Sequence, residues 1–341
     1  MKHLAIICLL FVHSITHAQL SDFGNIDFQK ADSIAELYDG ERLEMLPLLA
    51  HNLTRDLDSE VEKFRAIYTW VCSNITSDHG SFVKNRKMRE KYQDDEQALS
   101  QWNAEFQVEV FNKLLKSKKT VCTGYAYLMK ELSYFAGIEC VIVDGYGRTV
   151  VSNVGEASIP NHSWNAVQLN GKWYLCDPTW SSGHTLIPSY KFIQEYNDGY
   201  FLADPAVFVR SHYPLDPDWI LMEEAPSFQE FLDAPLIYKH TYKQQLIPIE
   251  PKQMKVKLAK DELLRFVLSG PSNLDLDKIR LEIASGPNNV LSVKPEIRMM
   301  ETGLLELTYP FKKRVNHDVH IKLGELYIAT YVVKMGKARL H

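Results

Sequence analysis

The chain has 341 residues, of which 45% are hydrophobic and 24% are charged, and its formal net charge is -5 at pH 7. This length is sufficient for two or three domains with full cores, and the composition is not that of a disordered protein. The slightly acidic balance gives no general electrostatic reason to bind nucleic acid, so we expect no nucleic-acid partner. A local basic run from Lys84 to Lys91 is offset by Asp94 to Glu96 and is interpreted as a solvated surface.

Residues 1–18 have the features of a secretory signal peptide. Met1 to His3 give a positive start, and Leu4 to Val12 form an apolar run that is too short to span a bilayer. Thr16 to Ala18 then place small residues at the two positions that a signal peptidase reads. We therefore expect cleavage after Ala18 and export to the periplasm or the extracellular space. No later segment is apolar enough to cross a membrane, so no integral membrane segment is expected after cleavage.

The mature chain would keep four widely spaced cysteines: Cys72, Cys122, Cys140 and Cys176. A chain with a large core does not need a disulfide framework, even in an exported protein. The mature chain has no Cys-x-x-Cys or His-x-x-x-His pair, so we expect no metal site and no cofactor.

Helices are expected first along the chain. Residues 19–56 read as a helical lead-in with two turn-spaced apolar patches. A stronger helix is expected from Ser59 to Ile75, because Ser59 and Glu62 form a capping box ahead of an apolar stripe. Residues 76–106 are polar and highly charged, which predicts a long surface loop at the rim of a site. A short helix over Gln107 to Lys116 follows.

The stretch from Thr120 to Phe135 delivers a cysteine onto the start of a helix. Its apolar residues recur at three- and four-residue steps, and Gly137 supplies a stop; these apolar residues are Tyr125, Leu128, Leu132 and Phe135. Cys122 therefore lies at or just before the first turn, where unpaired backbone N–H groups and the positive helix end favour a thiolate. Taken alone, such a cysteine is more often a small buried apolar side chain.

Three strands follow that helix, over Glu139 to Asp144, Ser163 to Leu169 and Lys172 to Asp177. Asn170 and Gly171 between the last two strands are a strong signal for a two-residue hairpin turn. If they are the turn, Leu169 pairs with Lys172, and continuing the register places Trp164 opposite Asp177.

This register brings a histidine close to an aspartate. His162 precedes Trp164 by two residues, so it lies on the same face and is the diagonal neighbour of Asp177, within reach of the carboxylate. Cys176 faces the other way. A cysteine at a helix start, followed by a histidine and an aspartate on one hairpin face, has the order and chemistry of a thiol acyl-transfer triad. Each residue also has an ordinary alternative, an edge histidine for His162 and a turn aspartate before Pro178 for Asp177.

The same residues belong to motifs that resemble the transglutaminase-like superfamily of papain-like fold. In order, these motifs are Val121 to Ala126, Ala136 to Ile138, Asn161 to Val167 and Gly171 to Trp180. The resemblance runs from about Phe64 to Trp180, and two later stretches, Tyr200 to Pro205 and His212 to Trp219, are similar to the extension of the kyphoscoliosis-peptidase-like branch.

The resemblance implies a catalytic triad of Cys122, His162 and Asp177 on a helix packed against an antiparallel sheet. The upstream oxyanion-hole side chain of the family has no match in this sequence, which leaves the Cys122 backbone N–H as the only donor proposed for that role. Trp164 and Trp180 flank the site and are candidates for the walls of a substrate cleft, with core packing as an equal alternative.

From about residue 242 the chain changes to short alternating runs separated by Gly and Pro, which predicts an all-β, sandwich-like accessory domain over 242–341. The expected fold is therefore α+β, with a transglutaminase-like catalytic domain and its extension over 57–241. The expected function is an exported cysteine hydrolase that cleaves an amide or peptide bond through a Cys122 thioester. Its partner would be a protein or peptide, a cell-wall peptide being one option. The alternatives are an acyl transferase to a primary amine and a non-catalytic binding or adhesion module.

Overall fold

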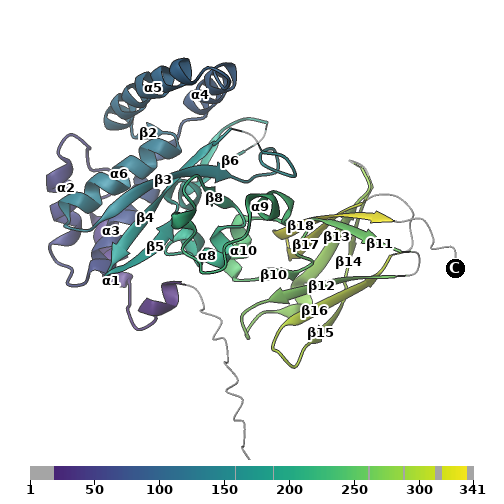
Figure 1. Cartoon of the computed structure of the whole chain (residues 1–341). Coiled ribbons are helices and arrows are strands. Elements are labelled where there is room, and N and C mark those ends of the chain that lie inside the picture. The colour runs from purple at the N-terminus through teal and green to yellow at the C-terminus, as the bar shows by residue number, and fades with distance from the viewer. Residues whose placement is uncertain are drawn as a thin grey trace, which may run out of the picture.

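The computed structural model describes residues 19–157, 159–186, 188–259, 262–286, 289–311 and 317–335. Helices packed on a small antiparallel sheet come first, and a sheet-rich region follows, as Figure 1 shows. This is the α+β arrangement that the sequence predicts. The predicted signal peptide, residues 1–18, lies outside the described residues. None of the described helices combines the length and the apolar character needed to cross a membrane.

The first helices build one layer of the N-terminal region. The 3-10 helix η1 (Gln19–Phe23), α1 (Gln29–Leu37) and α2 (Leu46–Thr54) precede α3 (Glu60–Asn74). The predicted capping box is present at the start of α3, where the Ser59 side chain accepts from the Glu62 N–H. Buried side chains of α1 and α2 join those of α3 in one apolar core. The lead-in is therefore helical, as expected, and packs as part of this layer.

The prediction of a long loop over residues 76–106 is wrong. The chain there forms α4 (His79–Lys91) and α5 (Glu96–Ser117), after the short strand β1 (Thr76–Ser77), which pairs in parallel with β2 (Lys119–Thr120). Ser81 is the only buried residue of α4, so this helix has no apolar stripe that a periodicity argument could detect. Side-chain caps start both helices instead, since Asp78 accepts from the Ser81 N–H and Asp95 from the Ala98 N–H.

The helix that carries the cysteine is α6 (Cys122–Phe135). Tyr125, Leu128 and Leu132 are fully buried, as the predicted stripe requires. Phe135 is 42% exposed, so its inclusion in the buried stripe was wrong. The stripe stops early because the helix ends there: the chain turns at Gly137 with φ +74°, and the Ile138 N–H bonds back to the Ser133 carbonyl.

The central sheet is antiparallel throughout, with the order β5 (Lys172–Cys176), β4 (His162–Leu169), β3 (Cys140–Gly147) and β8 (His212–Pro214). Leu169 pairs with Lys172, and the ladder runs to Asn165 opposite Cys176, which confirms the predicted hairpin register. Helix α6 covers one face of this sheet; the Asn165 side-chain amide, for example, donates to the Ala126 carbonyl at 2.9 Å.

Short elements follow β5 and lead to the C-terminal region. They are α7 (Pro178–Ser182), β6 (Gly183–Thr185), β7 (Phe192–Gln194), η2 (Asp198–Tyr200), α8 (Pro205–Phe208), η3 (Pro217–Ile220), α9 (Phe228–Asp233), β9 (Leu236–Ile237) and α10 (Lys239–Gln244). Buried side chains of α8 and α10 pack in the same apolar cluster as Val143 and Trp164 of the central sheet.

The C-terminal region contains two sheets. One has the order β10 (Ile247–Glu250), β12 (Leu263–Ser269), β16 (Leu305–Pro310) and β15 (Glu296–Met299). The other has the order β11 (Lys255–Leu258), β18 (Leu326–Met335), β17 (His317–Leu323), β13 (Ile279–Ala284) and β14 (Val290–Val293), with η4 (Leu276–Lys278) before β13 and β9 paired to β18. Phe266 and Tyr331 bring the sheets together, with ring centroids 4.6 Å apart. The sandwich-like prediction is confirmed, and the apolar core continues from it into the central sheet.

Candidate active site

Cys122 is the first residue of α6, with Val121 as the helix cap. All four cysteines in the described residues are free, and Cys122 is the partly exposed one, whereas Cys72, Cys140 and Cys176 are buried. The loop before the helix folds tightly against it because residue 124 is glycine: a Cβ there would lie 1.8 Å from the Thr120 hydroxyl oxygen. The sequence therefore places one accessible thiol at a helix N-terminus.

His162 begins β4, and Asp177 follows the last residue of β5. The Asp177 Oδ2 atom accepts from His162 Nε2 at 2.7 Å. Its Oδ1 atom caps α7 by accepting from the backbone N–H groups of Thr179 at 2.7 Å and Trp180 at 3.1 Å. The turn role and the histidine-pairing role of Asp177 are thus filled by one buried carboxylate, because each oxygen serves one of them.

The Cys122 thiol lies beside His162 and the backbone N–H of Ser163, and both lower its pKa. Because Asp177 occupies Nε2 of His162, Nδ1 is the ring nitrogen left for the thiol. Burial alone would lower the pKa of His162, but the charge and hydrogen bond of Asp177, with the bond to Cys122, raise it to about 10. Burial would raise the pKa of Cys122, but the bond to His162 and the charge of its ring lower it overall. Both shifts favour a thiolate–imidazolium pair near neutral pH.

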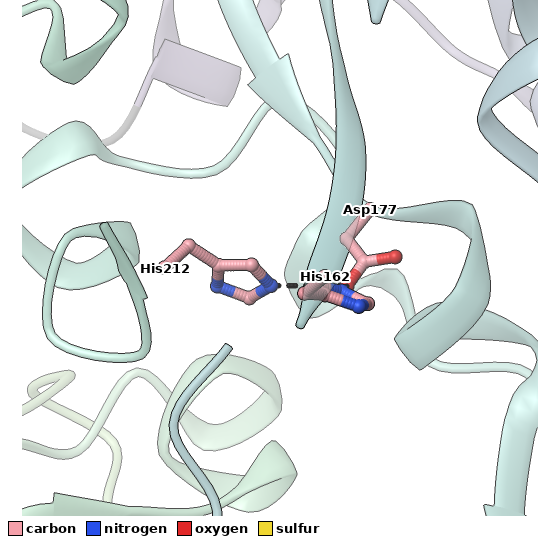
Figure 2. Close-up of side chains that lie close together, drawn as sticks. All are labelled: His162, Asp177 and His212. Carbon is pink, nitrogen blue, oxygen red and sulfur yellow. Dashed lines mark hydrogen bonds and ion pairs between the residues drawn. The ribbon is translucent and has the colours of Figure 1, made fainter. Parts of the chain in front are cut away.

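A second histidine, His212 of β8, contacts the same carboxylate, as Figure 2 shows. His212 Nε2 lies 3.0 Å from Asp177 Oδ2, and its Nδ1 lies 2.9 Å from the Ser211 hydroxyl, which in turn contacts the Tyr242 hydroxyl. Burial lowers the pKa of His212 to about 4 despite the carboxylate. A neutral His212 therefore donates from Nε2 to Asp177 and accepts from Ser211 at Nδ1.

Sequence reasoning missed His212 as a site residue. The hairpin register relates β4 to β5 alone, whereas His212 arrives through the pairing of β8 with β3, opposite Gly147. The approach of β8 needs glycine at 145, because a Cβ there would lie 2.2 Å from the Tyr213 carbonyl oxygen and 2.8 Å from the Cα of Pro214. The isolated glycine in a strand pattern was the available signal, since it marks a close approach of another element.

The structure separates the two tryptophan candidates. Trp164 is fully buried, with its ring 5.2 Å from that of His212 and 6.0 Å from that of Phe208. The prediction that it forms a cleft wall is therefore wrong: it lies on the same sheet face as His162, but α8 covers that face. Trp180 stacks on the His162 ring at 4.9 Å, so it flanks the site, and its role in a cleft stays a prediction.

A cavity of about 220 Å³ opens beside Cys122 and His162. One part of its lining comes from the start of α6 and residues 159–163, and another wall comes from α4 and the turn after it. The residues of this second part are Phe82, Asn85, Arg86, Arg89, Glu90 and Gln93. Residues 76–106 do therefore line the site, although as helix and not as loop. Arg89 belongs to the basic run that was interpreted as a solvated surface, and that interpretation is wrong for this residue.

The ligand atoms of His162, Asp177 and His212 lie within 4.8 Å of one another, a spacing that metal ligands also show. The donor set does not suit a metal near neutral pH, however. With a pKa of about 10, His162 is protonated there, and an imidazolium nitrogen has no lone pair to offer. Hydrogen bonding to one carboxylate oxygen describes the cluster better than coordination does.

Residues 48–178, which include Cys122, His162 and Asp177, match the model of the transglutaminase-like superfamily. The kyphoscoliosis peptidase of Mus musculus is 29% identical over 61% of this chain. The kyphoscoliosis peptidase of Homo sapiens is 28% identical over 86% of this chain. Hillarin of Drosophila melanogaster is 26% identical over 62% of the chain. The chain covers 29%, 42% and 25% of those three proteins, less than half of each. Residues 48–178 of this chain are therefore a transglutaminase-like domain.

Proposed function

We propose that the protein is a cysteine hydrolase that cleaves an amide or peptide bond through a thioester on Cys122. The observation that carries the proposal is the hydrogen bond between His162 and Asp177 beside the Cys122 thiol. The shifted pKa values of Cys122 and His162 favour the ion pair that nucleophilic catalysis needs. The name peptidase, which two of the similar proteins carry, supports the same reaction class.

In the proposed reaction the Cys122 thiolate attacks the carbonyl carbon, and the developing oxyanion lies near the unpaired N–H groups of the first turn of α6. The protonated His162 then gives its proton to the leaving amine, which leaves a thioester. A water molecule, deprotonated by the now neutral His162, attacks the thioester and releases the acid and the thiolate. Asp177 holds the ring orientation throughout and stabilises the imidazolium.

His212 has a positioning role in this scheme. Its bond to Asp177 Oδ2 adds a second donor to the oxygen that His162 uses. Because His212 stays neutral, it fixes the carboxylate without competing for the proton that His162 carries. The ring stack with Phe208, at 3.9 Å between centroids, holds His212 in turn.

The substrate class in the proposal is a protein or peptide, including a cell-wall peptide, and the proposed location is outside the cytoplasm. A transferase would use the same thioester and pass the acyl group to a primary amine instead of water. A pure binding module would have no use for a thiol held by a histidine and an aspartate, so we rank that alternative last.

The fate of the acyl group separates hydrolysis from transfer. Labelled protein, peptide and cell-wall-peptide donors should be incubated with and without a saturating alkylamine, and the products separated by mass spectrometry. We expect the free acid as the main product and the alkylamide as a minor one, both absent with Cys122→Ala. A predominant alkylamide that requires Cys122 would establish the transferase, and no turnover of any donor would favour the binding module.

A further inference from the structure

We propose that Arg89 of α4 binds a carboxylate group of the substrate in the cavity beside Cys122, so that the enzyme prefers acidic peptides. The preference for peptides rests on the hydrolase function proposed above. The carboxylate site itself rests on the cavity and on the surroundings of Arg89.

The first observation is the position of Arg89. It lines the same cavity of about 220 Å³ as Cys122 and His162, but it comes from a different element, helix α4. The charges of Cys122 and Asp144 act on the Arg89 guanidinium, so Arg89 lies within electrostatic range of the thiol. A substrate whose scissile amide lies at Cys122 would therefore place its neighbouring groups near Arg89.

The second observation is that no hydrogen-bond or ion-pair partner of Arg89 is found among the described residues. Its Nε is buried and has no hydrogen-bond partner, and within the described residues the guanidinium forms no ion pair. The other buried arginines are fully engaged: Arg65 binds Asp32 and Asp198, and Arg148 donates to four backbone carbonyls. A half-buried guanidinium without partners is costly, and a ligand anion would relieve that cost.

The third observation is the balance of charge around the cavity. Arg86 and Glu90, which also line it, offset each other, since Arg86 Nε lies 3.8 Å from Glu90 Oε1 on the same helix. Arg89 is thus the uncompensated charge of that wall. A planar fork of N–H donors is suited to a carboxylate at this point.

The test uses alkylation of Cys122 and needs no turnover. The reagents are iodoacetate and N-iodoacetyl amino acids of increasing chain length, each compared with its own carboxamide. The measured quantity is the ratio of the two alkylation rates at Cys122, for wild type, Arg89→Gln and Arg86→Gln. Arg86→Gln is the matched control, because it removes an equal charge from the same helix and the same cavity, but one that Glu90 offsets.

We expect one reagent length at which Arg89→Gln lowers the carboxylate-to-carboxamide ratio by about tenfold, while Arg86→Gln changes it by less than about twofold. Melting curves of the variants check the fold. The proposal is overturned if no reagent length gives a ratio that depends on Arg89. Equal slowing of both reagents by Arg89→Gln would also overturn it, since Arg89 would then act only on the thiolate.

A peptide arm identifies the source of the carboxylate. One pair of peptides contains Glu or Gln with an amidated C-terminus, and a second pair is neutral apart from a free or amidated C-terminus. We expect Arg89→Gln to lower kcat/KM selectively for the carboxylate member of one pair. If the alkylation ratio depends on Arg89 but no amide is cleaved, the carboxylate site is supported and the hydrolase function is rejected. If peptides are cleaved but neither experiment depends on Arg89, the hydrolase function is supported and the carboxylate site is rejected.

Discussion

The His162→Ala variant should lose at least about a thousandfold in the rate of amide hydrolysis, with its fold retained. The loss has two sources, because His162 both holds Cys122 as a thiolate and protonates the leaving amine. Without the ring, burial would set the pKa of Cys122 and raise it. Iodoacetamide should label Cys122 before the buried cysteines in wild type, and in the variant it should react with Cys122 much more slowly near neutral pH.

The rate of Cys122 alkylation as a function of pH gives the direction in which His162→Ala should shift the pKa of the thiol. The raised pKa of His162 keeps the imidazolium charged up to a pH of about 10, and the lowered pKa of Cys122 extends the thiolate below the usual range of a thiol. Wild-type alkylation should thus already be fast near neutral pH, and the rise in rate for His162→Ala should move to higher pH. His51→Ala, at an exposed position of α2, is the control. Unchanged alkylation in a folded His162→Ala protein would contradict the ion pair.

The Asp177→Asn variant should lower the rate by about ten-thousandfold, through the tautomer of His162. In the wild type one carboxylate oxygen accepts from two histidines and the other accepts from the backbone of Thr179 and Trp180. An amide offers one acceptor and one donor, so its NH₂ group must face either the histidine N–H groups or the helix cap. If the NH₂ group faces the histidines, it favours the wrong tautomer of His162. If it faces the helix cap, the backbone N–H groups of Thr179 and Trp180 lose their acceptor.

This variant should also be less stable, by about 1–3 kcal/mol, because either arrangement leaves buried donors without acceptors. Burial would raise the pKa of Asp177, but His162 and His212 lower it, so its stabilising effect is present above the usual carboxyl pKa and is lost as the pH falls. Cys176→Ala, one residue earlier on the opposite face, is the control for the mechanism. A folded Asp177→Asn protein with full turnover would show that Asp177 has no part in the chemistry.

The features predicted correctly from the sequence are those set by local rules. Asn170 and Gly171 adopt φ values of +51° and +78°, which a two-residue hairpin turn requires, and this turn fixes the register that brings His162 to Asp177. The start of α3 follows equally from its capping box, and the end of α6 from Gly137. These signals span a few residues, so one sequence is enough to interpret them.

The errors come from contacts between distant segments. Trp164 was assigned to the correct sheet face, but nothing near it in sequence reveals that α8 would cover that face. His212 reaches Asp177 through strand pairing over a long sequence separation. Helix α4 is stabilised by caps and charge pairs such as Lys84 with Glu109, which leave no apolar period in the sequence. Arg89 was missed as a residue of the cavity because it lies on this helix, whose sequence gave no sign of its position.

Mass analysis of an acid-quenched reaction tests most directly whether the protein forms a thioester on Cys122. A slowly hydrolysed acyl donor should be mixed with the wild type, quenched in acid, and the intact protein and its peptides weighed. The proposed function predicts a mass increase equal to the acyl group, located on the peptide that contains Cys122 and absent from Cys122→Ala. Hydrolysis of the same donor by Cys122→Ala, or a wild-type turnover that never places the acyl group on Cys122, would contradict it.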